Sequence, residues 1–124
     1  MIKNFENITQ ELNDDEMNLV PMVIKGFEKY TINNPIKSDV IVKKINDYFE
    51  THKIKMKMTG ARLRKIVNYI RTNSLQPLMA TSKGYFVSND VNVIMDQIQS
   101  LNQRAKSIRD CAHGLELLIK NKQK

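Results

Sequence analysis

The residues best suited to chemistry form the polar side of one amphipathic segment, residues 59–73. Its apolar side chains fall on one stripe when projected at about 100° per residue, which predicts a helix with one buried face. These apolar residues are Leu63, Ile66, Val67 and Ile70. The opposite side carries arginine, lysine and asparagine, which hydrogen-bond to guanine and adenine, and small side chains that can contact the thymine methyl group. The polar face therefore predicts contact with base edges in the major groove of DNA.

Thr59 is the predicted N-cap of this helix, and the helix should end near Asn73–Ser74. Lys65 and Asn68 lie near the centre of the polar face, while Arg64 and Arg71 flank one of its edges. The residues of this segment that we predict to contact DNA are Thr59, Ala61, Arg62, Arg64, Lys65, Asn68, Arg71 and Thr72.

A predicted β-hairpin follows this helix. Two segments of strand character, Gln76–Thr81 and Tyr85–Ser88, flank a tight turn at Ser82–Gly84, in which Gly84 can adopt a positive φ. The tip of such a hairpin can touch phosphate or the minor groove. Ser82 and Lys83 are therefore the second set of predicted DNA contacts.

The distribution of charge supports this prediction. The chain has a net charge of +7. Residues 51–84 hold eight lysines and arginines and no acidic residue. Such a block raises the local electrostatic potential and attracts polyanions.

Other elements must position the polar face. Two helices are predicted before it, at Thr9–Tyr30 with caps at Asn13 or Asp14, and from Ser38, as cap, to about Phe49. Pro21 marks either a kink or a start nearer Leu19.

Between the second and third helices, Lys53–Met58 reads as a short extended segment or a loop. The connection Thr51–Met58 is longer than the turn of a minimal helix-turn-helix. The predicted fold class is therefore mainly α with a small β-hairpin: a winged helix-turn-helix with a long C-terminal helix. We expect a flexible arm at residues 1–8, a winged-helix domain at residues 9–90 and the long helix at residues 91–124.

Two runs carry a family resemblance. The run Met58–Arg71 (MTGARLRKIVNYIR) and the run Ala80–Val87 (ATSKGYFV) resemble small winged-helix proteins of phages and prophages, which are often found near replication genes. The likeness covers about residues 36–119, and Leu78–Ala80 departs from it. The resemblance implies a helix-turn-helix core, DNA as the ligand and a non-enzymatic role, with Arg64, Asn68 and Arg71 matching the polar positions of the motif.

The C-terminal helix should be capped at Asn89–Asp90 and run to about Lys120. It has an apolar seam that steps alternately by four and three residues, the spacing of a coiled coil. The seam consists of Ile94, Ile98, Leu101, Ala105, Ile108, Ala112, Leu115 and Ile119. It predicts either a homodimer or packing against Leu19–Phe27 of the same chain, and Gly114 marks a candidate early end. The residues predicted to form the dimer contact are Ile98, Leu101, Ala105, Ile108, Ala112 and Leu115.

Several classes of function are not indicated. The two histidines have no neighbouring cluster of carboxylates, the glycines form no phosphate-binding loop, and the single cysteine excludes zinc-finger spacing. We therefore predict no enzyme activity, no cofactor and no metal site. Cys111 should be a buried or half-buried small hydrophobe, and one free cysteine fits a reducing compartment. With no signal-like N-terminus and no apolar membrane span, we expect a protein of the bacterial host cytoplasm.

Three functions remain open from sequence. The first is double-stranded DNA binding that regulates phage or prophage transcription or replication. The second is a protein-interaction adaptor built on a winged-helix scaffold. The third is RNA or single-strand binding, for which Tyr69, Tyr85 and Phe86 are the available stacking side chains.

Overall fold

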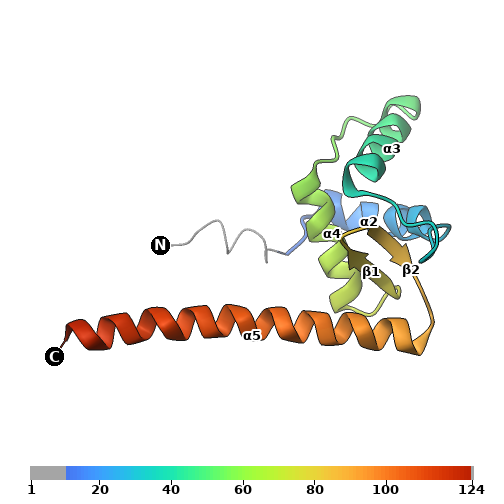
Figure 1. Ribbon diagram of the computed structural model, residues 1–124. Coiled ribbons are helices and arrows are strands. Elements are labelled where there is room, and N and C mark those ends of the chain that lie inside the picture. The colour runs from blue at the N-terminus through green and yellow to red at the C-terminus, as the bar shows by residue number, and fades with distance from the viewer. Residues whose placement is uncertain (1–10, 124) are drawn as a thin grey trace. The chain divides into compact units, whose positions relative to one another are not determined.

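The computed structural model of the protein describes residues 11–123, so the predicted arm at residues 1–8 lies outside the described residues. The described residues form four helices and one two-stranded antiparallel hairpin (Figure 1). They fall into two compact units that divide between Asn89 and Asp90, and each unit is described on its own. The predicted class, mainly helical with a small β-hairpin, is confirmed for this part of the chain.

Helix α2, Asp14–Phe27, begins with a capping box. The side chain of Asn13 accepts a hydrogen bond from the Glu16 amide at 2.8 Å, and Glu16 Oε1 accepts one from the Asn13 amide at 3.1 Å. This reciprocal pair satisfies two amide donors that the first helical turn cannot bond internally. The predicted cap at Asn13 is therefore confirmed.

The alternative start of α2 near Leu19 is wrong, because the helix continues through Pro21. An interior proline costs about 3 kcal/mol. Burying one large aliphatic or aromatic side chain contributes roughly 1.5–3 kcal/mol, and α2 buries Leu19, Val23 and Phe27. The apolar stripe therefore outweighs the defect. The helix ends at Phe27, three residues before the predicted end at Tyr30.

Helix α3, Ser38–Thr51, starts one residue earlier than a cap at Ser38 would require. Ser38 is the first helical residue, and Lys37 occupies the N-cap without a side-chain hydrogen bond. The cause is the preceding residue, since Ile36 exchanges two backbone hydrogen bonds with Tyr85, at 2.9 and 2.8 Å. The extended chain ends at Lys37, whose carbonyl accepts the first helical hydrogen bond, from the Ile41 amide at 3.1 Å, so Lys37 and not the predicted Ser38 is the N-cap.

The connection between α3 and α4 is a loop without strand pairing, so of the two readings of Lys53–Met58 the loop is correct. Asn46 anchors its end: the side-chain amide donates to the Met58 carbonyl at 3.0 Å and accepts from the Met58 amide at 2.7 Å. Met58 is itself buried in the core. The end of the loop is thereby fixed one residue before the N-cap of α4.

Helix α4, Gly60–Thr72, lies beside α2 and α3 (Figure 1). Thr59 is its N-cap, as predicted, and its hydroxyl accepts from the Arg62 amide at 3.1 Å. The helix ends within two residues of its predicted boundary. The predicted buried stripe is confirmed, because all four of its members are buried: Leu63, Ile66, Val67 and Ile70.

The hairpin consists of β1, Leu78–Thr81, and β2, Gly84–Val87, with Thr81 paired to Gly84. Both strands lie within about two residues of their predicted bounds, and the loop between them is only Ser82–Lys83. Backbone groups on the outer edge of β2 are hydrogen-bonded in two places. Tyr85 pairs with Ile36 in the bridge, and the Val87 amide donates to the Tyr30 carbonyl at 2.9 Å. The chain that links α2 to α3 therefore acts as a short third strand.

Helix α5, Val91–Lys122, is capped by Asp90, whose carboxylate accepts from the Asn92 amide at 2.9 Å. The predicted early end at Gly114 is wrong, since the helix continues through it. One interior glycine costs only about 1 kcal/mol relative to alanine, too little to end a long helix. The expectation for Cys111 is also wrong, because this α5 residue is exposed.

Candidate nucleic-acid interface

The burial of the apolar stripe fixes the rotation of α4 and therefore what it exposes. Ala61, Arg64, Asn68 and Thr72 are all exposed along the opposite side. The side chain of Arg64 makes no hydrogen bond or ion pair with any of residues 11–123, and its guanidinium lies beside Gly60. We call these four residues the α4 outer face. It carries one arginine, one amide and two small side chains that are available to a ligand.

Two further bases of α4 are held by a buried carboxylate. Glu16 of α2 is only 3% exposed. Its Oε2 accepts from Arg62 Nε at 3.1 Å and its Oε1 accepts from Lys65 Nζ at 2.8 Å. Arg62 also donates through Nη1 to the Lys57 carbonyl at 2.8 Å. The charges of Arg62 and Lys65 are thus compensated within the protein.

The same network shifts the titration of Glu16. Burial alone raises the pKa of a carboxyl group because it disfavours the charged form. The hydrogen bonds from Lys65, from the Asn13 amide and from Arg62 oppose this effect and outweigh it, so the pKa of Glu16 lies below its ordinary value of 4.5. The carboxylate therefore stays ionised at neutral pH and pairs with both bases.

This role of Glu16 was not predicted from the sequence. The available signal was the position of Glu16 three residues after Asn13, which predicts a capping box. That signal predicts the hydrogen bond between one carboxylate oxygen of Glu16 and the Asn13 amide. It does not reveal the partners on α4, which are 46 and 49 residues away in sequence.

Arg71, the last predicted base of the helix, is half-buried and already engaged in an interaction within the protein. Thr59 is exposed, but its hydroxyl serves as the helix cap. The predicted contacts on α4 therefore separate into an outer face and a set of residues that have structural partners.

A shallow groove runs beside the α4 outer face, between α4 and the start of α2. Asn68 and Thr72 line one wall, while Glu11 and Met17 line the other. The acidic side chain of Glu11 sets a limit on how closely a polyanion can approach this wall.

The hairpin tip exposes the second predicted set. Ser82 and Lys83 are both exposed. Thr81 shapes the turn, because its hydroxyl donates to the Gly84 carbonyl at 3.0 Å and accepts from the Lys83 amide at 3.2 Å. Lys37 donates through Nζ to the Ser82 carbonyl at 3.0 Å. The tip is therefore a short turn with a defined conformation and one outward lysine.

Gly84 is required by this arrangement. Its φ is +126°, a conformation that residues with a side chain rarely adopt, and a Cβ atom there would lie 2.4 Å from the Ile36 carbonyl oxygen. The prediction of a positive φ at Gly84 is confirmed. The glycine lets β2 approach the Ile36 bridge, and the bridge in turn fixes the hairpin.

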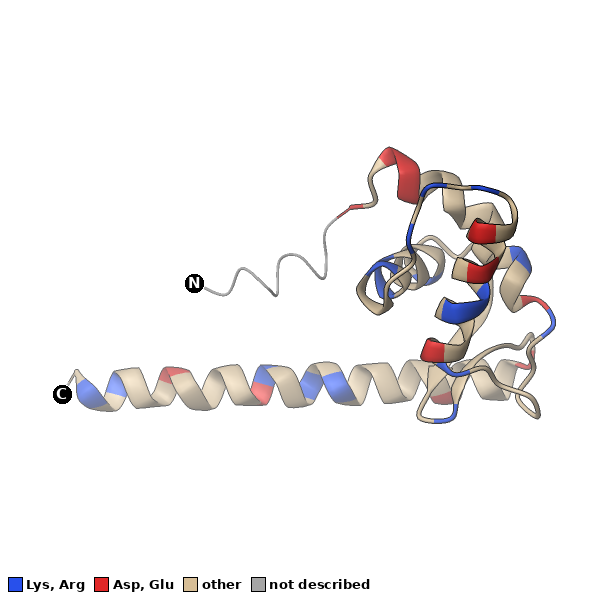
Figure 2. Ribbon diagram, turned by 90° about the horizontal axis from the view of Figure 1, so that it is seen from above, with Lys and Arg blue, Asp and Glu red and all other residues tan. Residues whose placement is uncertain are grey.

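Additional bases precede α4. Lys53, Lys55 and Lys57 are all exposed on the loop between α3 and α4. Figure 2 shows these positive segments on the loop and on α4, whereas α3 shows both signs of charge. The exposed bases of the loop, the α4 outer face and the hairpin tip lie in the block without acids, residues 51–84, whereas the bases of α3 are interspersed with acids.

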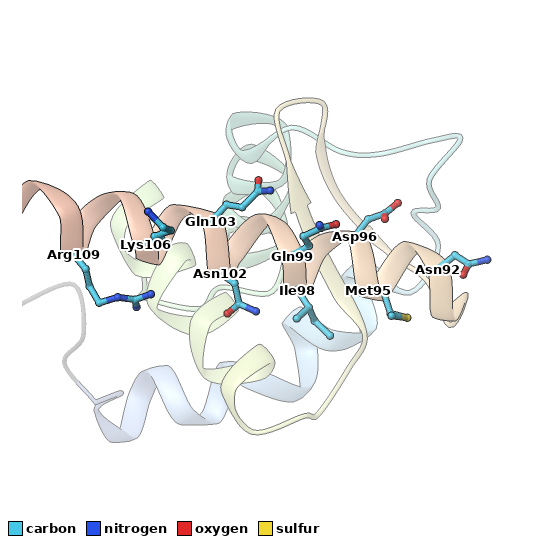
Figure 3. Close-up of a pocket in the computed structure, with 9 residues that line it drawn as sticks. All are labelled: Asn92, Met95, Asp96, Ile98, Gln99, Asn102, Gln103, Lys106 and Arg109. Atoms are coloured by element: carbon cyan, nitrogen blue, oxygen red, sulfur yellow. The ribbon is translucent and has the colours of Figure 1, made fainter.

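On α5, one surface hollow is bounded by residues of that helix alone. Figure 3 shows Met95, Ile98 and Asn102 pointing to one side of α5, while Gln99 and Gln103 point to the other. A hollow bounded by a single helix encloses no ligand, so we interpret it as the surface of an exposed helix rather than a binding cavity.

Among residues 11–123, no group of three or more histidine, cysteine, aspartate or glutamate side chains is placed to hold a metal ion. Within the same range, no helix is long and apolar enough to cross a membrane.

The stacking side chains considered for single-stranded ligands are buried or half-buried. Phe86 is 5% exposed. Tyr85 packs edge-on against Phe27 with ring centroids 5.4 Å apart, and Tyr69 is half-buried against the core. Packing against the core uses part of each ring, which reduces the aromatic surface on which bases could stack.

Comparisons of the chain with protein-family models, with curated proteins and with solved structures find no match.

Proposed function

We propose that this protein is a non-enzymatic, double-stranded DNA-binding protein with a winged-helix fold. The order of elements supports the fold: α2, the Ile36 bridge, α3, α4 and then the hairpin. In this arrangement α4 is the recognition helix and lies in the major groove, with α3 supporting it. The hairpin is the wing, and Lys83 contacts a phosphate.

The observation that carries the proposal is the α4 outer face. A helix that buries Leu63 and Ile66 and presents Arg64 and Asn68 to solvent offers the donors and acceptors that read guanine and adenine. The acid-free block of residues 51–84 adds the exposed bases Lys53, Lys55, Lys57 and Lys83, which favour association with the phosphate backbone.

The structure refines the contacts that we propose. Arg64, Asn68, Thr72 and Ala61 contact bases or the groove wall, while Ser82 and Lys83 contact the backbone. Arg62 and Lys65 act differently, because their bonds to Glu16 orient α4 against α2. We propose them as supports of the recognition helix that add a partly screened charge.

We further propose that the protein acts as a homodimer through α5, in phage or prophage transcription or replication in the bacterial cytoplasm. The dimer is supported by the exposed apolar residues of α5, including Ile98, Ile108 and Leu115. The biological role rests on the sequence resemblance of the α4 and hairpin segments.

The test is a fluorescence-anisotropy titration with duplex DNA at several salt concentrations. We expect the logarithm of the association constant to fall linearly with the logarithm of the salt concentration. The double variant Arg64→Ala/Asn68→Ala should weaken binding to its preferred site by about 2–6 kcal/mol if each residue contributes roughly 1–3 kcal/mol.

The matched control is Lys25→Ala, which removes one positive charge from an exposed position near the end of α2. It should change the affinity no more than a general loss of charge does. Full affinity in the double variant would contradict the recognition-helix assignment, and no detectable DNA binding at low salt would contradict the proposed function as a whole.

A protein-interaction adaptor is the second candidate, and a groove between α2 and α3 favours it. Met22, Ile41 and Tyr48 line this groove, with Lys29 and Lys44 among its polar residues. This alternative predicts retention of partner binding in Arg64→Ala/Asn68→Ala and its loss in Tyr48→Ala.

A further inference from the structure

The exposed seam of α5 has a pattern of large and small residues that distinguishes between two ways of pairing. In heptad notation, position a is occupied by Val91, Ile98, Ala105, Ala112 and Ile119, and position d by Ile94, Leu101, Ile108 and Leu115. Ile98, Ile108 and Leu115 are 51%, 62% and 64% exposed. No residue of α5 is buried.

We propose that α5 pairs with α5 of a second copy of the chain in antiparallel orientation, with Ala105 opposite the partner subunit's Ile108. This inference rests on the homodimer of the proposed function and adds the orientation and register of its two helices. Two observations carry it: the sizes of the seam residues and the placement of the flanking arginines.

Residue size favours the antiparallel pair. In a parallel pair each residue faces its own copy, so Ala105 would face alanine and Ala112 would face alanine, leaving two adjacent a layers poorly filled. In the antiparallel register Ala105 faces the partner subunit's Ile108, and Ala112 faces the partner subunit's Leu101. Every small residue then meets a large one.

The same register keeps the whole seam paired. Ile98 lies opposite the partner subunit's Leu115, and Ile94 lies opposite the partner subunit's Ile119. All eight seam residues predicted from the heptad pattern therefore lie in apolar layers. A shift of one heptad in either direction would leave residues at one end of each helix without a partner.

The charges of the flanking residues also favour the antiparallel pair. The residues that flank the seam are at positions e and g, and they include Arg104 at g and Arg109 at e, both exposed. In a parallel pair, position g contacts position e of the following heptad on the other helix, so Arg104 would face the partner subunit's Arg109 on both sides of the dimer. Such like-charge contacts destabilise a coiled coil.

In the antiparallel pair, e faces e and g faces g, which separates these arginines. Arg109 then lies opposite the partner subunit's Asn102, and Arg104 lies opposite the partner subunit's Cys111. Figure 3 shows Asn102 and Arg109 projecting on the same side of α5 as Ile98, as this flanking position requires. No like-charged pair remains along the seam.

One consequence is the separation of the two DNA-binding units. The two copies of Val91 are offset by 31 positions along the antiparallel pair, about 46 Å at 1.5 Å per residue. The units therefore emerge at opposite ends of the helix pair, whereas a parallel pair would bring them to the same end.

The experiment measures distances between nitroxide spin labels in the full chain. In a Cys111→Ser background, one label is attached at Ser107→Cys and, in a separate variant, at Asn121→Cys. Both residues occupy heptad position c, so a parallel pair gives both the same short distance. The antiparallel pair brings the two labels at 107 to nearly the same height and separates those at 121 by about 43 Å along the axis.

Each outcome decides between the proposals. A short distance at 107 together with a long one at 121 supports the antiparallel register. Short distances at both positions overturn it and leave the homodimer intact. A monomer mass in light scattering with no intermolecular distance overturns both, and then α5 is covered by its own chain or by a different partner. DNA binding is measured separately by the anisotropy titration, so a failure of the proposed pairing can be distinguished from a failure of the proposed DNA binding.

A second variant tests the charge argument without labels. Arg104→Glu places an acid opposite Arg109 only in a parallel pair, which should tighten that dimer about tenfold as two like-charge contacts become opposite-charge contacts. In the antiparallel pair residue 104 faces Cys111, and the dissociation constant should change less than about threefold. A tenfold tightening in analytical ultracentrifugation would overturn the proposed orientation.

Discussion

Glu16 and Lys65 are joined by a hydrogen-bonded ion pair of 2.8 Å, although they lie 49 residues apart in the chain. The carboxylate is almost fully buried, whereas the lysine side chain keeps 19% exposure. Since Arg62 binds the other carboxylate oxygen, one acid of α2 orients two bases of α4. The position of the candidate recognition helix therefore depends on a residue that is not expected to touch DNA.

Replacing this acid should destabilise the first unit. Glu16→Gln removes the carboxylate charge, and with it the compensation of Arg62 and Lys65, while it retains the shape of the side chain. Breaking a buried ion pair on one side costs about 3–5 kcal/mol when both partners are buried. Since both bases reach solvent here, we expect a loss of about 2 kcal/mol in the free energy of unfolding, measured by urea denaturation.

Asp15→Asn is the matched control, because it removes one negative charge from the same helical turn at an exposed position. It should change the free energy of unfolding by less than about 0.5 kcal/mol. Equal effects of the two substitutions would show that the network with α4 contributes nothing specific.

The lowered pKa of Glu16 predicts that the contribution of its carboxylate to the free energy of unfolding depends on pH. Because the folded-state pKa lies below the ordinary value of 4.5, the unfolded state binds the proton more readily, and the ionised carboxylate stabilises the fold above that value. This stabilisation is lost as the pH falls through the lower, folded-state pKa.

The measurement is the free energy of unfolding of the wild type and of Glu16→Gln between pH 7 and pH 3. The difference between them should be constant from pH 7 to about pH 5 and should shrink at more acidic pH. A difference that grows on acidification would contradict the sign of the shift.

Gly84 should be intolerant of a side chain. Gly84→Ala combines an unfavourable positive φ with a Cβ atom 2.4 Å from the Ile36 carbonyl oxygen, which is backbone and can move only with the bridge. We expect a loss of about 2–3 kcal/mol in stability, together with weaker DNA binding because the hairpin tip moves. Thermal denaturation and the anisotropy titration measure the two effects.

Gly26, in contrast to Gly84, should tolerate a side chain. It lies inside α2, and a Cβ atom there would meet no atom within 4 Å. Gly26→Ala should therefore raise the stability by up to about 1 kcal/mol, as expected for glycine to alanine in a helix. If both alanine variants behaved alike, the steric argument for Gly84 would be wrong.

The sequence predicted features that depend on neighbours along the chain. The caps at Asn13, Thr59 and Asp90 are local hydrogen bonds, and the buried stripe of α4 follows from helical periodicity. The hairpin followed from a turn with a suitably placed glycine. Each of these signals lies within a few residues of the feature that it predicts.

Features set by distant residues were missed or misplaced. Ser38 has the chemistry of a cap, but the bridge between Ile36 and Tyr85 moves the cap to Lys37. Arg62 and Lys65 belong to the polar face of α4 by periodicity, yet an acid from α2 binds both. Such long-range pairings leave no periodic trace, so a sequence reading assigned these bases to DNA together with Arg64.

The contrast between Arg62 and Arg64 gives the sharpest test of the interface. Arg62→Ala leaves Glu16 with one base fewer, so it should lower the free energy of unfolding by about 1–2 kcal/mol. Arg64→Ala removes an exposed side chain without a partner among residues 11–123, and it should leave the stability within about 0.5 kcal/mol.

For DNA affinity the order of the two variants should be reversed, because Arg64 is the base that is free to donate to guanine. Its loss should cost about 1–3 kcal/mol at the preferred site and less on unrelated duplexes. Paired measurements of urea denaturation and DNA titration on the two variants separate these effects. If Arg62→Ala weakened DNA binding more than Arg64→Ala at temperatures where both are folded, the outer face of α4 would not be the surface that reads the bases.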